Sequence, residues 1–289
     1  MVRNSLLDKY DDLKASSLKC AFSPDMTALI GDLYSGCLSF LDSMNREKLI
    51  SKVDNKSYFA FSNGRKLSRA INTDLYEPSF EYWQKLSKAM VKNDISAFSS
   101  QSINKILYTM AISFCASVDL IKDGDQKTPG TFYECFIAYF FSWRVGVEPV
   151  KSIQILNLDG QDTRLPTDLI FNLGTQLHKF HVPGKTSTRE RSIMLWAHQK
   201  VIDGVYGVGR FMGTPVLLAE TKVDKSKKEV VEICLPDQWR VYQLYIAKLS
   251  RIYYLDVPAS YKKLNEDFPP LNVKPFSDFF FEWSTISPA

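Results

Sequence analysis

Two carboxylates interrupt apolar stretches of this sequence. Glu134 stands in residues 130–136 (GTFYECF), near the start of an apolar segment, and Asp168 stands in residues 165–171 (LPTDLIF). A carboxylate among apolar residues is costly to bury unless a cation or hydrogen bonds compensate it. Taken alone, either acid could be a satisfied structural residue or the partner of an arginine, so neither establishes a site.

A lysine completes the pattern. Lys185 follows Asp168 by 17 positions and lies between a stretch that predicts a strand and one that predicts a helix. An acid on one strand and a lysine at the end of the next can face one point of a sheet. Carboxylate oxygens suit Mg²⁺, and a lysine can position or help deprotonate a water that attacks a phosphodiester. The order helix acid, strand acid, strand lysine therefore indicates metal-assisted phosphodiester hydrolysis.

Three segments then resemble, in order, motifs of the type II restriction endonucleases of the PD-(D/E)XK nuclease superfamily, in the branch that cuts CCGG, CCNGG and CCWGG type sites. Residues 130–134 (GTFYE) resemble its helix motif, a Gly followed four residues later by a supporting Glu. Residues 166–168 (PTD) resemble its PD element with one residue inserted, and residues 185–191 (KTSTRER) resemble its Lys-x-x-x-Arg-(Glu/Asp)-Arg element almost literally. The resemblance covers about residues 130–260.

The resemblance implies a Mg²⁺-dependent endonuclease in which Glu134 and Asp168 gather the metal and Lys185 positions or activates the water. In related enzymes the Arg-(Glu/Asp)-Arg segment enters the major groove and reads neighbouring G·C pairs. By that resemblance the base readers are three consecutive residues, Arg189, Glu190 and Arg191. Arginine binds guanine O6 and N7 and glutamate accepts from cytosine N4, each contact giving about 1–3 kcal/mol of discrimination. The alternative is a helix N-terminus with a solvated charge cluster.

One position departs from the family pattern. The branch usually carries a second metal-binding Glu thirteen or fourteen residues after the lysine, where this chain has His198 and Gln199. Either His198 or Gln199 takes that place, directly or through a water, or another acid such as Glu190 is used. A lone His on a helix is more often structural, although its position here favours a role in the site.

A second acid–lysine pair competes with the first. Glu220 and Lys222 form a literal Glu-x-Lys tripeptide on a predicted strand, the standard second half of the superfamily motif. They follow Asp168 after a gap of 52 residues that contains a complete strand–helix unit. We therefore prefer Lys185 as the catalytic lysine and keep Glu220 with Lys222 as the alternative.

The charge distribution favours a nucleic-acid partner. The chain has a net charge of +4, but residues 174–228 carry ten basic and four acidic side chains and so a net charge of +6. A basic face in a nearly neutral protein is typical of one that holds phosphates in a cleft. Residues 63–66 (NGRK), with Arg65 and Lys66 and then Arg69, form a further basic loop that could grip phosphates or simply be solvated.

Hydrophobic periodicity predicts the elements that position these residues. We expect helices over residues 79–93, 102–120, 131–143, 192–202 and 238–249 and strands over 150–158, 165–173, 177–182, 215–222 and 251–255, with a loop at 122–130 and a turn at 159–162. The predicted fold class is α/β (α+β), a restriction-endonuclease-like central mixed β-sheet flanked by helices. Residues 1–125 form a mostly helical region that supports DNA binding or dimerisation, and residues 126–289 form the nuclease core.

Composition excludes several classes of protein. The longest apolar run, residues 135–141, is shorter than the roughly 18–20 residues that a membrane span needs, and the N-terminus lacks a signal-peptide core. Five scattered cysteines without a CxxC pair suggest neither a zinc site nor a disulfide framework. We therefore expect a reduced, cytoplasmic protein.

The sequence hypothesis is a type II restriction endonuclease that cuts double-stranded DNA at a short palindromic site containing G·C pairs. Its cofactor is Mg²⁺, and by resemblance its partner is a DNA methyltransferase that protects the same site in the host. A palindromic site implies a homodimer, or a tetramer, because the symmetry of the site mirrors that of the protein. Two alternatives are a non-catalytic DNA-binding protein on the same fold, which the missing second acid motivates, and a structure-specific DNA-repair nuclease.

Overall fold

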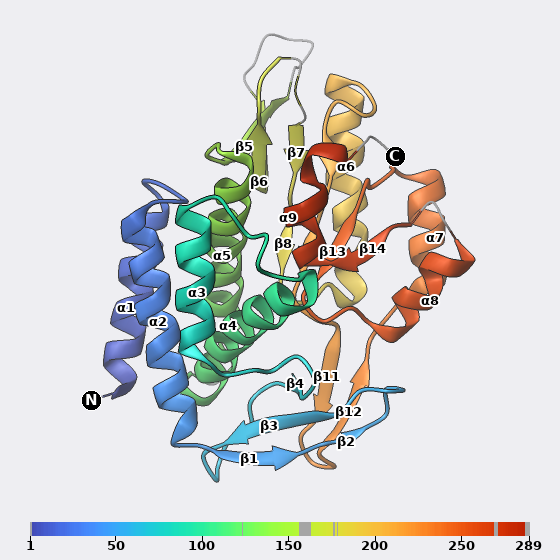
Figure 1. The fold of residues 1–289 in the computed structure, drawn as a ribbon. Helices are drawn as coiled ribbons and strands as arrows, with labels where there is room; N and C mark the ends of the chain where they lie inside the picture. Colours follow the sequence, from blue (N-terminus) through green and yellow to red (C-terminus); the bar gives the residue numbers. More distant parts are fainter. Residues whose placement is uncertain are drawn as a thin grey trace. The chain divides into compact units, whose positions relative to one another are not determined.

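A computed structural model describes residues 2–122, 124–155, 163–175, 177, 179–268 and 271–286 (Figure 1). The chain forms two compact units. Unit 1 comprises residues 1–143 and 220–233, and unit 2 comprises residues 144–219 and 234–289. The functional division that the sequence suggests at residue 125 stays a prediction.

Unit 1 is built mainly from helices. They are α1 (Val2–Ser17), α2 (Pro24–Asp42), α3 (Phe80–Val91), α4 (Ser100–Ile121) and α5 (Lys127–Val145). The helices predicted at 79–93 and 102–120 are confirmed as α3 and α4. Serines Ser23, Ser79 and Ser99 precede α2, α3 and α4, and each side chain accepts a hydrogen bond from the backbone N–H three residues later. These caps satisfy amide groups that have no partner within the helix.

Helix α4 is the core helix of unit 1. By length and composition it could cross a membrane, but 89% of its most apolar stretch is buried within the structure. Phe114 of α4 stacks on Phe132 of α5 at 4.1 Å between ring centroids, and Tyr10 of α1 packs against Phe114 at 5.2 Å. A helix that is apolar all round is expected where other helices cover each of its faces.

The predicted loop at 122–130 is wrong in its second half, because α5 begins at Lys127. Asp125 explains this early start. Its carboxylate accepts hydrogen bonds from the Thr128 backbone N–H at 2.9 Å and from the Thr128 hydroxyl at 2.7 Å, which is a helix cap. The polar residues that suggested a loop are in part the residues that start the helix.

Unit 1 also contains strands that the helical prediction for residues 1–125 missed. One sheet has the order β1 (Asn45–Lys48), β3 (Tyr58–Ser62), β4 (Ile71–Asn72), with antiparallel neighbours. A second has the order β11 (Thr221–Asp224), β12 (Glu229–Glu232), β2 (Ile50–Ser51), in which β12 and β2 run parallel. The hairpin β11–β12 therefore belongs with strands almost 180 residues earlier in the chain.

Unit 2 contains the predicted central mixed sheet. Its strands are β5 (Val150–Ile155), β6 (Thr163–Asn172), β7 (Lys179–His181), β8 (Gly184–Lys185), β9 (Met212–Gly213), β10 (Val216–Leu217), β13 (Ile252–Tyr254) and β14 (Val273–Pro275). The pairs β5–β6 and β6–β7 are antiparallel, and β7–β9, β8–β10, β10–β13 and β13–β14 are parallel. The Thr214 N–H donates to His181 O at 2.8 Å and the Val216 N–H donates to Pro183 O at 2.9 Å. Pairing thus runs on from β7–β9 into β8–β10 and joins two four-stranded sheets, with the orders β5-β6-β7-β9 and β14-β13-β10-β8.

Helices cover both faces of this sheet. Helices α6 (Ile193–Tyr206), α7 (Pro236–Tyr245) and α8 (Ala259–Asp267) share a core with Leu217 and Tyr254 of the sheet. On the other face, Phe279 of α9 (Phe279–Glu282) packs edge-on against Phe180 and Tyr253. Three 3₁₀ turns, at residues 189–191, 276–278 and 283–285, complete the described elements.

Several predicted boundaries in this half of the chain change. The strand predicted at 215–222 is two short strands, β10 and β11, with residues 218–220 between them. The helix predicted at 238–249 ends at Tyr245, and the strand predicted at 177–182 is reduced to β7. The whole turn predicted at 159–162 and the end of the strand predicted at 150–158 lie outside the described residues.

A mostly buried ion pair fastens the basic loop of unit 1 to α4. The Arg69 guanidinium donates to both oxygens of the Asp119 carboxylate at 2.8 Å, and the Arg69 backbone N–H donates to the same carboxylate at 2.9 Å. Arg69 thus has a structural role in the fold of unit 1.

We predict that Asp119→Ala lowers the free energy of unfolding by about 3 kcal/mol, because it leaves the mostly buried arginine without its partner. Urea denaturation measures this loss. The matched control is Lys85→Ala, which breaks the exposed Lys85–Glu81 pair on α3 and leaves the unfolding curve nearly unchanged. Equal effects of the two substitutions would contradict the structural role of the Arg69–Asp119 pair.

Candidate active site

Backbone pairing between β6 and the segment that follows β7 stops at Asp168 and Gly184. The Val182 N–H still donates to the Leu169 carbonyl at 2.9 Å. Two residues later the Gly184 N–H donates to Asp168 Oδ2, a side-chain oxygen, at 3.0 Å. The Asp168 carboxylate thus takes the place of a backbone acceptor where the two strands part, which fixes its orientation.

The structure brings Asp168 and Lys185 together. Lys185 Nζ donates to Asp168 Oδ2 at 2.5 Å, and the side chains are 42% and 19% exposed. The lysine has further protons to donate. No described residue contacts Asp168 Oδ1 through a hydrogen bond or ion pair. The pair therefore has a spare donor and a spare carboxylate oxygen at the surface of unit 2.

A buried polar network that sequence analysis missed lies on the same face of the sheet. His181 Nδ1 lies 3.0 Å from Gln199 Oε1. Gln199 Nε2 donates to Asp203 Oδ1 and to the Phe211 carbonyl, both at 2.9 Å. The signal was present in the sequence, because His181 interrupts an apolar strand just as Asp168 does.

Burial decides the charge of this network. Removal from water lowers the pKa of His181 from 6.5 to about 4, although its hydrogen bond to Gln199 acts in the opposite direction. Burial also raises the pKa of Asp203, and the Gln199 hydrogen bond again opposes the shift. At neutral pH the imidazole is therefore uncharged.

The two residues at the position of the usual second acid differ in their surroundings. Gln199 is 1% exposed, and both ends of its amide are engaged in the network. His198 is half-buried, with its ring centroid 6.3 Å from that of His181. His198 therefore has the freer side chain of the two.

The candidate base readers lie on the 3₁₀ turn that precedes α6. Arg189 and Arg191 are exposed, and Arg189 has a positive φ of 47°. The backbone of Glu190 belongs to this turn, but its side chain lies outside what the structure describes. The segment is thus an irregular turn and not the first turn of α6 itself.

The other predicted site residues belong to unit 1. Glu134 is half-buried on α5. Glu220 is 1% exposed, whereas Lys222 on β11 is exposed. Within this tripeptide the acid and the lysine therefore lie in different environments.

The basic loop at residues 63–66 is a tight turn after β3. The Asn63 side chain accepts from the backbone N–H groups of Arg65 and Lys66 at 3.1 and 2.9 Å, and Gly64 has a φ of 83° that favours glycine. Arg65 is exposed and Lys66 is half-buried. Neither takes part in an ion pair with any described residue.

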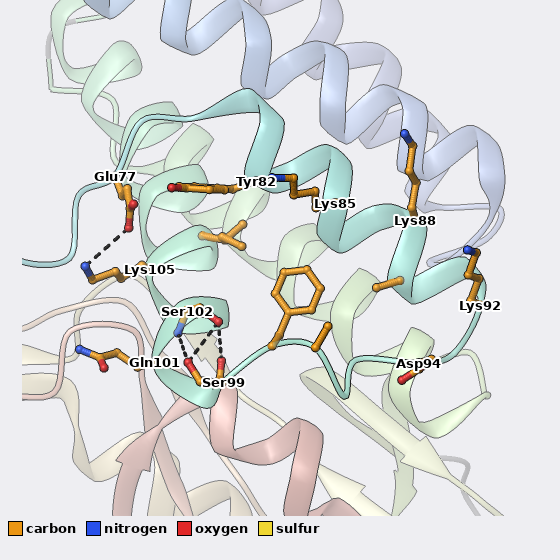
Figure 2. A pocket seen from close by; sticks show the side chains of 14 residues that line it. Glu77, Tyr82, Lys85, Lys88, Lys92, Asp94, Ser99, Gln101, Ser102 and Lys105 are labelled. Carbon is orange, nitrogen blue, oxygen red and sulfur yellow. Dashed lines mark hydrogen bonds and ion pairs between the residues drawn. The ribbon is translucent and has the colours of Figure 1, made fainter.

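Unit 1 also has an open hollow of about 800 Å³ between α3 and the start of α4 (Figure 2). Lysines flank it, but Lys85 is paired with Glu81 and Lys105 with Glu77. Figure 2 shows the Lys88 and Lys92 ammonium groups pointing away from its centre. The side chains that line it include no histidine or cysteine.

The acids and histidines of the described residues form no cluster of three or more that could hold a metal ion. Asp168 Oδ1 is nevertheless an available carboxylate oxygen, and Mg²⁺ often takes only one or two carboxylates together with substrate phosphates. The oxygen chemistry of Asp168 therefore fits such an ion.

No protein-family profile and no curated protein sequence matches this chain. Among solved structures, the chain is similar to the crystal structure of the type IIP restriction endonuclease Kpn2I, with a TM-score of 0.81 and 24% sequence identity. The similarity covers 99% of this chain and 97% of that chain. The chain has the restriction-endonuclease-like fold that its sequence predicts.

Gly213 provides a test of the network, because a Cβ there would lie 2.7 Å from Gln199 Oε1 and 2.6 Å from Leu249 Cδ2. We predict that Gly213→Ala lowers the free energy of unfolding by about 1–3 kcal/mol through overpacking. The control is Gly204→Ala at an exposed position of α6, where a Cβ meets nothing within 4 Å. That change should stabilise the protein by about 0.5–1 kcal/mol in the same urea titration. A tolerated Gly213→Ala would show that Gln199 does not hold its place.

The pKa of His181 predicts a pH dependence of stability. The folded protein keeps this imidazole neutral down to about pH 4, whereas the unfolded chain binds a proton below its ordinary pKa of 6.5. Its contribution to stability is therefore complete above pH 6.5 and is lost as the pH falls towards 4, by about 3 kcal/mol in all. Urea unfolding at pH 7.5 and 4.5 should show a larger loss for the wild type than for His181→Asn. Equal losses would mean that His181 titrates normally.

Proposed function

We propose that this chain is a sequence-specific DNA endonuclease that hydrolyses phosphodiester bonds with Mg²⁺, as part of a restriction–modification system. The observation that carries the proposal is the Asp168–Lys185 pair at the parting of β6 from β7 and β8. The restriction-endonuclease-like fold supports it, because an acid on one strand and a lysine on the next are the central elements of the motif that the sequence resembles.

Each residue of the pair has a distinct task. Lys185 uses a spare N–H to hold the attacking water and to stabilise the negative charge that develops on the phosphate. Asp168 holds that lysine in place through a hydrogen bond, and its second oxygen would bind Mg²⁺. A bound Mg²⁺ would polarise the phosphate and lower the pKa of a water.

Further ligands complete the proposed centre. Glu134 on α5 is the second carboxylate, as the family resemblance implies. His198 is a better stand-in than Gln199 for the missing acid, because Gln199 is buried in its own hydrogen bonds. Glu190 is a third possible ligand. Glu220 with Lys222 stays the alternative to the Lys185 assignment, although the exposure of Lys222 beside a buried Glu220 does not favour it.

Recognition of DNA is proposed for the turn at residues 189–191. Arg189 and Arg191 are exposed there and would donate to guanine O6 and N7, with Glu190 accepting from cytosine N4. Arg65 and Lys66 would bind phosphates. The site would be a short palindrome containing G·C pairs, of the CCGG, CCNGG or CCWGG type by resemblance.

The wider context follows from that activity. A palindromic site calls for a homodimer or a tetramer. A restriction enzyme in the cytoplasm requires a DNA methyltransferase that protects the same site in the host. Two other functions use the same fold, a DNA-binding protein without cleavage and a repair nuclease that recognises DNA structure.

Plasmid cleavage with Mg²⁺ tests the proposal, followed by sequencing of the fragment ends. Discrete fragments with one common end sequence support a restriction enzyme. Gel shifts without cleavage identify a binding protein, and ends without a common sequence identify a structure-specific nuclease. Addition of EDTA should abolish cleavage, since the metal supplies part of the activation.

We predict that Lys185→Ala lowers the cleavage rate at least about 100-fold, because it removes the donor that holds the water. Lys222→Ala is the matched control and should cut at the rate of the wild type. Gel shifts should show that both variants still bind DNA. If Lys185→Ala cuts normally and Lys222→Ala does not, the lysine assignment is wrong.

A further inference from the structure

His181 has a hydrogen-bonding atom that the structure leaves without a partner. The side chain is 0% exposed, and its Nε2 contacts no hydrogen-bonding group among the described residues. A buried acceptor or donor in this state costs about 1–3 kcal/mol, so such atoms are usually bound to an internal water.

The surrounding bonds determine which imidazole nitrogen carries the proton. Gln199 Nε2 faces two acceptors, the Asp203 carboxylate and the Phe211 carbonyl, so this end of the amide must be the donor. The other end, Oε1, faces His181 and can only accept. The proton of the neutral imidazole is therefore on Nδ1, and Nε2 presents a lone pair.

The position of His181 relates this lone pair to the candidate active site. His181 pairs across the sheet with Ile170, and Asp168 lies two residues earlier on β6, so both side chains point to the same face. The charges of His198, Asp168 and Lys185 all act on the imidazole. The imidazole therefore lies on the same face of the sheet as Asp168, whose carboxylate accepts from Lys185.

We propose that His181 is a positioning residue, whose unprotonated Nε2 accepts a hydrogen bond from a water held by the Asp168–Lys185 pair. One hydrogen of this water would point to His181, which leaves an oxygen lone pair free to face the phosphate. The inference rests on the proposed nuclease function.

Two features of the fold maintain this arrangement. Gly213 lacks the Cβ that would displace Gln199, so the amide can reach the imidazole. Burial keeps the pKa of His181 at about 4, so near neutral pH the ring stays an acceptor and adds no positive charge beside Lys185. A protonated ring would donate from Nε2 and turn the water the other way.

Two substitutions separate the lone pair from the structural hydrogen bond. In His181→Asn the amide nitrogen can take the place of Nδ1 and still donate to Gln199, but no acceptor remains at the position of Nε2. In His181→Gln the longer side chain can place an amide oxygen near that position. If His181 is purely structural, His181→Asn should cut DNA faster than His181→Gln. If His181 positions the water, His181→Gln should cut DNA faster.

We predict that His181→Asn lowers kcat for DNA cleavage about 100-fold, the scale expected for a misplaced reactant. Its KM for DNA and its unfolding curve at pH 7.5 should stay close to those of the wild type. The kcat of His181→Gln should be at least about tenfold higher than that of His181→Asn, because its amide oxygen restores part of the positioning of the water. Equal kcat values for the wild type and His181→Asn would overturn the inference, and so would a better rate for Asn than for Gln.

The tautomer is measured independently by ¹⁵N NMR of histidine-labelled protein, which has only three histidines. The signals lost in His181→Asn identify residue 181, and we expect a protonated Nδ1 and a bare Nε2. A proton on Nε2 would refute the inference even if the protein cuts DNA. If the wild type does not cut DNA, the proposed function fails and the inference fails with it. If the wild type cuts and His181→Asn cuts equally well, only the inference fails.

Discussion

The candidate site depends on one exchange, in which a side-chain carboxylate replaces a backbone carbonyl. At Gly184 the N–H can no longer reach the neighbouring strand, and Asp168 Oδ2 receives it instead. On the other side, Lys185 is still held in the sheet, because its carbonyl accepts from the Leu218 N–H at 3.0 Å. The backbone of Lys185 is therefore held in the sheet, while its side chain is partly exposed. A reactive group needs both conditions.

Helix α6 supplies hydrogen-bond partners for polar groups that lie where the strands separate. Where a sheet loses regular pairing, polar groups are left inside a protein, and their burial is costly unless they find partners. Gln199 and Asp203 lie one turn apart on α6, so both can face the sheet. Gln199 binds His181, the Phe211 carbonyl and the Asp203 carboxylate, which explains why an amide occupies a position where the family resemblance suggests an acid.

The sequence predicts those parts of the molecule that rest on local rules. The central mixed sheet, α3, α4 and α6 follow from apolar periodicity, and Asp168 with Lys185 follows from residue type and strand order. The prediction misses strands such as β2, β4, β8 and β9, which have two residues each and therefore no period to detect. It also misses the role of His181, because that role depends on a partner 18 residues away and on a glycine further on. The helix start at Lys127 is missed because the polar residues that suggest a loop include Asp125, which caps the helix.

The hairpin β11–β12 has a consequence for how the protein is made. The chain passes between the two units three times, after residues 143, 219 and 233, and β12 pairs with β2 near the beginning of the chain. During synthesis, unit 1 cannot be completed until residue 233 has emerged, and by then residues 144–219 are already available to fold. Strand β2 must wait for a partner from far along the chain, and such long-range closures slow folding. Each unit can therefore complete its folding only after part of the other unit has been synthesised.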